Sequence, residues 1–524
     1  MNNSLRWPAL AFLLCFFLSS CDDDEVQPPD TTSPEITISD FGEYVKGTFP
    51  ITVSATDNDV ISSIKLSING TSVATSENGT LDYSWDTKTM DEGMSKIKIE
   101  VSDQTGNTAV KDIDVRVMNY FFSFTSGAGY TSSSNADYVY LSDYEGNVLG
   151  VADLKVEGEQ KMETPDGYAY GTPVAINFYS YIDNSSVYIA SYLDFLPGSY
   201  HLDKPFPRTN PTVVGQHNVV LTGHDRSMPV GLSGRYLWGA SWFDMEGTYH
   251  AGMISETSDL FVSIVDESSQ SNKPKYGYIE SVAVGGTSEF AFDELTEMNQ
   301  QTYSLDFQAT FVKGDTWLPN ENIRYVGLAR TSGYNTSELS LFYPTDLFDE
   351  YDFSYRLDVD NISYKGSYDA AAPKSTLELL QVDIAELSFV DQTLDLQFSG
   401  TCDIVGLSGY KRFEYEGENR LFVNNVYCPG NLPVSFKVAT PPSSFAFSEN
   451  LPLVDELIFD LIVFEELGNE DGYENLKVKL LNKSGVIAEY RTKSFYIDAD
   501  GKKAGDSGDI HSIIADRKME DFIH

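Results

Sequence analysis

Histidines are the first residues of this sequence to consider as metal ligands. Four of the six lie between positions 201 and 250, at His201, His217, His224 and His250. A zinc site needs three or four ligands that converge and are oriented by further hydrogen bonds. These spacings match no recognised ligand pattern, so we expect scattered histidines and no metal there.

The segment Asp498-Ala499-Asp500-Gly501 begins like a calcium loop. Such loops carry oxygen ligands at alternate positions, but Lys502 stands where the next ligand is expected. An exposed acidic turn is the preferred interpretation. We therefore expect neither a metal nor a cofactor.

Sequence motifs of catalysis are absent. The sequence has no Gly-x-Ser-x-Gly elbow, no Walker phosphate-binding loop, no His-Glu-x-x-His and no Cys-x-x-Cys. With 79 acidic residues, some carboxylate pairs must lie close together by chance, so no glycosidase pair can be nominated. The chain is expected not to be an enzyme, and a carbohydrate-active enzyme stays open as an alternative.

Aromatic residues suggest ligand binding in two places. If residues 235–243 form a strand, Tyr236, Trp238 and Trp242 lie on one face, where rings could stack on sugar CH groups. The same pattern is typical of a sandwich core, which is the preferred interpretation. Trp317, in a segment expected to be a loop, is the better candidate for an exposed platform.

Two cysteines are candidates for a disulfide. Cys402 and Cys428 each end a predicted strand, and a bridge closing the loop of about 26 residues would contribute roughly 3 to 4 kcal/mol. Such a bridge would be structural. Two buried free thiols are the alternative.

The first residues indicate export and lipid attachment. Residues 1–20 combine Arg6 with an apolar run too short to span a bilayer, as in a secretory signal peptide. Leu18-Ser19-Ser20-Cys21 is similar to a bacterial lipobox, in which the cysteine is lipidated and becomes the first residue of the mature chain. The resemblance implies a membrane partner, reached through acyl chains such as palmitate on Cys21.

Residues 21–34 form an acidic, proline-containing tether. The run Asp22–Glu25 resembles the export signal that sends lipoproteins of one Gram-negative phylum to the outer face of the outer membrane. That resemblance implies a chain that faces the exterior, and the periplasmic face is the alternative. An extended tether of this length would reach roughly 40 Å.

Composition and charge limit the possible partners. Thirty-five Lys and Arg against 79 Asp and Glu give a formal net charge of −44, which repels nucleic acid. The 41% of hydrophobic residues are enough to build folded cores. We therefore expect a folded, acidic protein that binds no nucleic acid.

Period-two alternation from Ile36 to Val117 predicts about seven short strands. Asn69-Gly70 is a hairpin signal, and Trp85 is expected in the core. With its Ser33-Pro34 opening and the segments 55–59, 83–87 and 103–107, the stretch resembles bacterial Ig-like domains. The resemblance implies a β-sandwich over residues 35–118 that acts as a spacer or adhesive module.

The rest of the chain also shows alternating runs and turn signals. We expect a β-rich domain over 119–306, a β-rich section over 307–370, a β-rich domain over 371–508, and a tail or short helix over 509–524. The predicted fold class is all-β, with an Ig-like sandwich followed by two or three further sandwich-type domains.

Three functions remain open. The first is a surface-anchored, non-catalytic binding or adhesion lipoprotein that captures glycan or another extracellular macromolecule. The second is a structural or assembly subunit of an outer-membrane complex. The third is a carbohydrate-active enzyme.

Overall fold

The computed structural model describes residues 29–126, 137–182, 186–202, 212–224, 230–237, 242–243, 248–264, 273–319, 325–345, 347–431, 433–468, 472–474, 477 and 490–497. The chain forms two compact units, Met1–Asn119 and Tyr120–His524. The first unit ends one residue beyond the boundary predicted at 118. Residues 1–20, the attachment residue Cys21 and the tail 509–524 lie outside the described residues.

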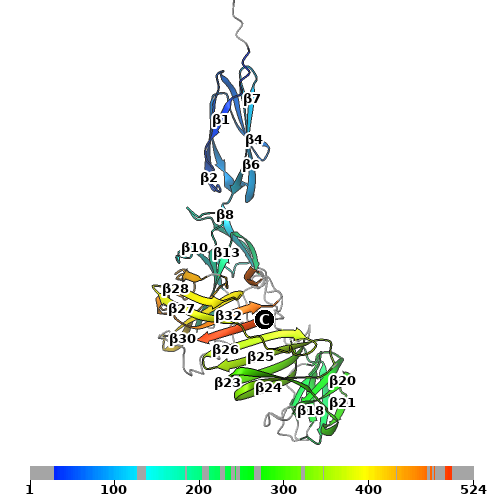
Figure 1. Cartoon of the computed structure of the whole chain (residues 1–524). Coiled ribbons are helices and arrows are strands. Elements are labelled where there is room, and N and C mark those ends of the chain that lie inside the picture. Colours follow the sequence, from blue (N-terminus) through cyan, green and yellow to red (C-terminus); the bar gives the residue numbers. More distant parts are fainter. Residues whose placement is uncertain are drawn as a thin grey trace, which may run out of the picture. The chain divides into compact units, whose positions relative to one another are not determined.

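The first unit is a sandwich of two antiparallel sheets (Figure 1). One sheet has the order β1-β2-β5 and the other β4-β3-β6-β7. The elements are β1 (Glu35–Ile38), β2 (Thr48–Thr56), β3 (Ile61–Ile68), β4 (Thr71–Ser76), β5 (Thr80–Asp86), η1 (Thr87–Thr89), β6 (Gly93–Asp103) and β7 (Thr108–Val117).

The alternation of the sequence explains this core. Ile51 and Val53 on β2 point inward and are buried, together with Trp85 on β5, so the prediction that Trp85 lies in the core is confirmed. Asn69 and Gly70 both have positive φ, 48° and 81°, and join β3 to β4 as the hairpin signal predicts.

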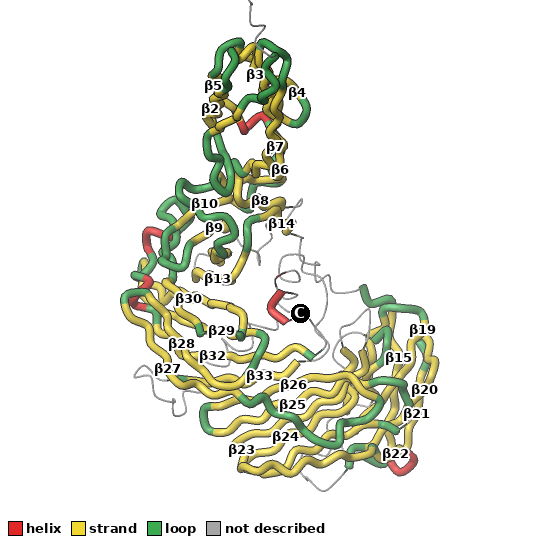
Figure 2. The backbone as a smooth tube through the Cα atoms, turned by 45° about the horizontal axis from the view of Figure 1, so that its top comes forward, coloured by secondary structure: helices red, strands yellow, loops and turns green. Residues whose placement is uncertain are grey.

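In the part of the second unit that the structure describes, twelve strands form one sheet in the order β10-β9-β12-β13-β30-β29-β32-β33-β26-β25-β23-β24 (Figure 2). Its strands are β9 (Tyr138–Ser142), β10 (Val148–Asp153), β12 (Val174–Ile182), β13 (Ser186–Phe195), β23 (Asn299–Pro319), β24 (Tyr325–Tyr343), β25 (Tyr351–Val359), β26 (Ile362–Ala370), β29 (Ile404–Tyr415), β30 (Glu418–Pro429), β32 (Ile458–Leu467) and β33 (Tyr490–Tyr496).

Smaller sheets accompany this main sheet. Two have three strands, β11-β8-β14 and β27-β28-β31. Their strands, with two 3-10 turns, are β8 (Tyr120–Ser126), β11 (Gly158–Glu163), β14 (Gly198–Leu202), β27 (Val382–Val390), β28 (Thr393–Gly400), β31 (Val434–Lys437), η3 (Ser448–Asn450) and η4 (Val454–Glu456). Leu394 and Phe436 from β28 and β31 share a core with Leu407 and Phe422 of the main sheet.

Two four-stranded sheets, β17-β18-β15-β21 and β16-β19-β20-β22, share a separate core that includes Val219, Met253 and Val262. The elements are β15 (Gly215–Thr222), β16 (Val230–Ser233), β17 (Trp242–Phe243), β18 (Thr248–Met253), β19 (Thr257–Ile264), β20 (Lys275–Ala283), β21 (Thr287–Ala291), η2 (Phe292–Glu294) and β22 (Thr296–Glu297). With these sheets, the described part of the chain is almost entirely β, so the predicted all-β class is confirmed.

The structure does not follow the predicted sections of the second unit. The boundary expected between 306 and 307 falls inside β23, and β26, from the section 307–370, pairs with β33 from the section 371–508. Backbone pairing between segments far apart in sequence merges the three sections into one sheet. A single sequence shows where strands occur but not which strands pair.

Among the described residues, no helix is both long enough and apolar enough to cross a membrane.

The core of the first unit supplies a matched test. Val101 on β6 is fully buried, whereas Val110 on β7 is 55% exposed. We expect Val101→Ala to lower the free energy of unfolding of this unit by about 2 kcal/mol, because two methyl groups leave the core and a cavity remains. Hydrogen exchange of β6 peptides in increasing denaturant measures the loss. Equal effects of Val101→Ala and Val110→Ala would contradict the assigned strand faces.

Candidate metal centre

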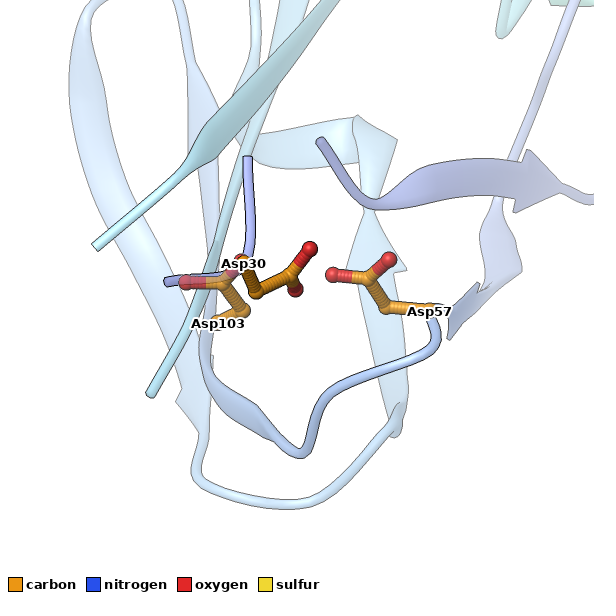
Figure 3. A group of neighbouring side chains, drawn as sticks. All are labelled: Asp30, Asp57 and Asp103. Carbon is orange, nitrogen blue, oxygen red and sulfur yellow. The ribbon is translucent and has the colours of Figure 1, made fainter. Parts of the chain in front are cut away.

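Three aspartates from separate segments meet at one place in the first unit. Asp30 precedes β1, Asp57 follows β2, and Asp103 is the last residue of β6. One carboxylate oxygen of each lies within 4.8 Å of those of the other two. Figure 3 shows the three side chains turned toward one another. The group is a set of oxygen donors from three parts of the chain.

Asp103 is the most rigidly held member and is only 2% exposed. Its Oδ1 accepts hydrogen bonds from the N–H groups of Gly106 at 2.6 Å and Asn107 at 2.8 Å, and its Oδ2 accepts one from Asn107 Nδ2 at 2.7 Å. Burial opposes ionisation, but these hydrogen bonds outweigh it and hold the pKa of Asp103 below its ordinary value. The carboxylate is therefore ionised at neutral pH.

Asp30 is tied to the same turn. Its backbone carbonyl accepts a hydrogen bond from Asn107 Nδ2 at 3.1 Å. The side chain of Asn58 and the N–H of Thr32 hold the pKa of Asp30 below its ordinary value. Two ionised carboxylates thus lie close together, and the end of the tether is fixed to the turn after β6.

Three carboxylate oxygens at this end of the unit are buried and have no hydrogen-bond partner among the described residues. They are the Oδ2 atoms of Asp30, Asp57 and Asp59. Clustered carboxylates repel one another, and buried oxygens without donors are costly. A divalent cation would remove both penalties, and a set made only of oxygens suits Ca²⁺ better than Zn²⁺.

This group is not predicted from the sequence. The segments 55–59 and 103–107 serve there only for the Ig-like resemblance, Asp30 is placed in the tether, and no metal is predicted. The available signal was the position of the acids, because Asp57 and Asp103 each stand where a strand ends. Nothing in the sequence alone shows that these strand ends and the tether share one end of the sandwich.

The histidines considered as zinc ligands have other partners. His217 contacts the carbonyl of Ala283 and the hydroxyl of Ser288, and His250 Nδ1 lies 2.9 Å from Asn218 Oδ1. Within the described part of the chain they do not gather as metal ligands. The segment 498–501, interpreted as an acidic turn, lies outside that part.

Trp317 lies in β23, so the predicted loop at this position is wrong. The residue pairs with Gly327 on β24 and Asp352 on β25, and hydrogen bonding on both sides makes the segment a strand. The ring is half-buried, and its Nε1–H donates to Ser354 Oγ at 3.2 Å. Its role as a sugar platform stays a prediction.

The aromatic run at 235–243 is not one continuous strand. Tyr236 lies in a turn after β16, where its N–H donates to Ser258 Oγ at 3.0 Å. Trp238 lies outside the described residues, and Trp242 begins β17 opposite His250. The expected single face of Tyr236, Trp238 and Trp242 is therefore interrupted, and sugar binding there stays a prediction.

Cys402 and Cys428 are free thiols in the structure, so the predicted disulfide is not formed there. Burial, together with Asp403 and Glu466, raises the pKa of Cys402 to about 12. Burial also raises the pKa of Cys428. Both thiols are therefore protonated at neutral pH.

Comparison with known proteins supports the Ig-like fold of the first unit. Residues 34–99 match the family described as Bacterial Ig domain, so the resemblance of the N-terminal segment is confirmed. No curated protein matches the chain.

Solved structures that show similarity come from several bacteria. The glucan-utilisation protein SGBP-B of Bacteroides ovatus shares 13% identity over 61% of this chain and 93% of its own, with a TM-score of 0.16. Fibronectin(III)-like modules of Clostridium thermocellum CbhA share 18% identity over 16% of this chain and 96% of their own, with a TM-score of 0.14. An endo-β-1,4-mannanase of Thermotoga petrophila shares 18% over 17% of this chain, which spans only 21% of that enzyme, with a TM-score of 0.15. Scores this low carry no argument about function.

Calcium titration tests the aspartate group. We expect the chelator-treated chain to bind Ca²⁺, and Asp57→Asn to weaken binding by about tenfold or more, because ligand charge sets calcium affinity. Isothermal titration calorimetry measures both. The matched control is Asp82→Asn, an exposed acid on β5 in the same unit. Unchanged heats for Asp57→Asn would show that the group is not the site.

Thiol reactivity tests the state of the cysteines. We expect Cys402 and Cys428 to react slowly with a disulfide reagent at pH 8 in the native Cys21→Ser chain, because the thiolate is the reactive form and burial suppresses it. Both should react fully in denaturant. If neither reacts in denaturant without a reductant, the chain carries the bridge that the sequence predicts.

Proposed function

We propose that this chain is a cell-surface lipoprotein, anchored through Cys21, whose β-sheet units bind glycan or another extracellular macromolecule without catalysis. In this arrangement the acidic segment 21–34 is the tether, the bacterial Ig-like unit is a spacer, and the second unit is the binding body. The outer face of the outer membrane is the proposed location.

The observation that carries this proposal is the position of a bacterial Ig-like sandwich directly after the tether. The family match begins at residue 34, where the tether ends. The hydrogen bond from Asn107 to Asp30 holds the last part of the tether on the turn that follows β6. Because this hydrogen bond fixes the tether where the sandwich begins, the sandwich can act as a stiff spacer. A freely jointed tether would leave the direction of the sandwich undefined.

The second unit supports binding through its extended sheet and aromatic content. Rings lie along the main sheet and its neighbouring loops, and several are only half-buried, such as Tyr181, Tyr415 and Trp317. Half-buried rings keep part of a flat apolar face in contact with solvent. Such faces, beside hydrogen-bonding groups, suit sugars.

Anchoring is tested by detergent partition. We expect the full chain, produced in a Gram-negative host, to enter the detergent phase and to incorporate labelled palmitate, because several acyl chains give effectively permanent membrane binding. Cys21→Ser should move it to the aqueous phase. Protease added to intact cells should cleave the anchored chain.

Two results would contradict the proposal. One is a wild-type chain that stays in the aqueous phase with a free thiol at Cys21. The other is complete protection from protease until the outer membrane is opened, which would place the chain on the periplasmic face. A chain that is anchored and exposed but always co-purifies with a membrane complex, and binds no glycan, would favour an assembly subunit.

A further inference from the structure

Arg420 is a buried cation at the margin of the largest core. It lies on β30 near the tip of the β29–β30 hairpin, opposite Phe413, and is 9% exposed. Alternation along β30 places it on the same side of the sheet as the core residues Phe422 and Val426. The arginine therefore stands where the apolar core ends and the hairpin tip begins.

Two aromatic rings lie against its guanidinium group, and a third ring packs on one of them. The central carbon lies 5.0 Å from the ring centroid of Tyr415 on β29 and 5.2 Å from that of Phe447, which precedes η3. Tyr415 meets Phe447 edge-on at 4.9 Å, and Tyr181 on β12 stacks on Phe447 at 5.0 Å. The three rings are half-buried.

Arg420 has no anionic partner among the described residues. Its Nε and Nη1 atoms are buried and make no hydrogen bond. Other buried cations are paired, since Lys493 lies 2.8 Å from Asp383 and Lys477 lies 2.6 Å from Glu474. A chain with 79 acids could easily supply one here. An unpaired buried guanidinium is costly, so its partner is best sought in a ligand.

Backbone strain at Phe447 supports a functional role for the cluster. This residue has φ 68° and ψ −5°, a left-handed conformation that bulky side chains seldom adopt. Strain of this kind persists where the surroundings impose it, and it gathers at ligand sites. Here the strained residue is Phe447 itself, whose ring contacts Arg420, Tyr181 and Tyr415.

We propose that Arg420, Tyr181, Tyr415 and Phe447 form a binding site for a carboxylated sugar, a hexuronic acid unit within an otherwise neutral glycan. The guanidinium group pairs with the carboxylate through Nη2, the donor that is not among its buried atoms, and the rings contact the CH face of the sugar. The net charge of −44 repels long polyanions, which favours a glycan with isolated uronic acids. This inference rests on the proposed glycan-binding function.

The test compares two probes on the full chain. One is a xylo-oligosaccharide that carries a single glucuronic acid, and the other is the same oligosaccharide without it. Isothermal titration calorimetry should show the charged probe binding at least tenfold more tightly. Arg420→Gln should remove that preference, and Arg420→Lys should restore only part of it, because lysine lacks the planar donors.

Matched variants separate binding from folding. Arg412→Gln removes an exposed arginine from the neighbouring strand β29 and should leave binding unchanged. Phe447→Gly removes a ring while glycine accepts the positive φ, so the fold should survive and binding of the charged probe should fall. Thermal unfolding of each variant checks the fold. Phe447→Gly keeps the test valid if Arg420→Gln fails to fold.

The outcomes distinguish this site from the proposed function. Equal affinity for both probes, or an unchanged preference in Arg420→Gln, overturns the site and leaves glycan binding intact. Binding of an acidic peptide but not of the charged sugar, lost in Arg420→Gln, overturns the ligand class. No binding of either probe also overturns the site, whereas failure of the surface anchor shows independently in the detergent and protease experiments.

Discussion

Lateral pairing of distant strands is the constraint on which the second unit depends. β13 pairs in parallel with β30, from Ser186 with Leu421 to Tyr192 with Tyr427, and β26 pairs with β33. These two contacts join three segments of the chain into one sheet. Parallel strands need a long connection between them, and here more than two hundred residues separate β13 from β30. Tyr181 joins the Arg420 cluster because β12 and β30 are brought into the same sheet.

Charged side chains at two places in the described structure, one in each unit, have buried atoms without hydrogen-bond partners. Most of the excess acids are compatible with a solvated surface, but Asp30, Asp57 and Asp103 are gathered at one place, where the Oδ2 atoms of Asp30 and Asp57 lack donors. Arg420 presents the opposite case, a buried cation without a carboxylate in an acidic chain. Both places leave a charge unbalanced by the described residues. Both are therefore suited to a charged ligand, a cation in the first unit and a carboxylate in the second.

Local patterns predict those features that local physics controls. Asn69-Gly70 predicts a hairpin because both residues accept positive φ, and Trp85 is expected in the core because it lies on the inward side of an alternating strand. Trp317 shows the limit of such reasoning. Its segment, Lys313 to Asn320, contains Gly314 and Pro319 and resembles a loop, yet pairing with β24 and β25 makes residues 313–319 part of a strand. Tertiary pairing outweighs local preference there.

By itself, the sequence determined the all-β class and the Ig-like unit, because alternation and turn residues are short-range signals. It also predicts lipid attachment, from the short segment around Cys21. Only the tertiary structure decided the strand order, the convergence of the three aspartates and the rings around Arg420. Those features join residues separated by tens to hundreds of positions, and no local preference encodes which of many similar strands will be neighbours.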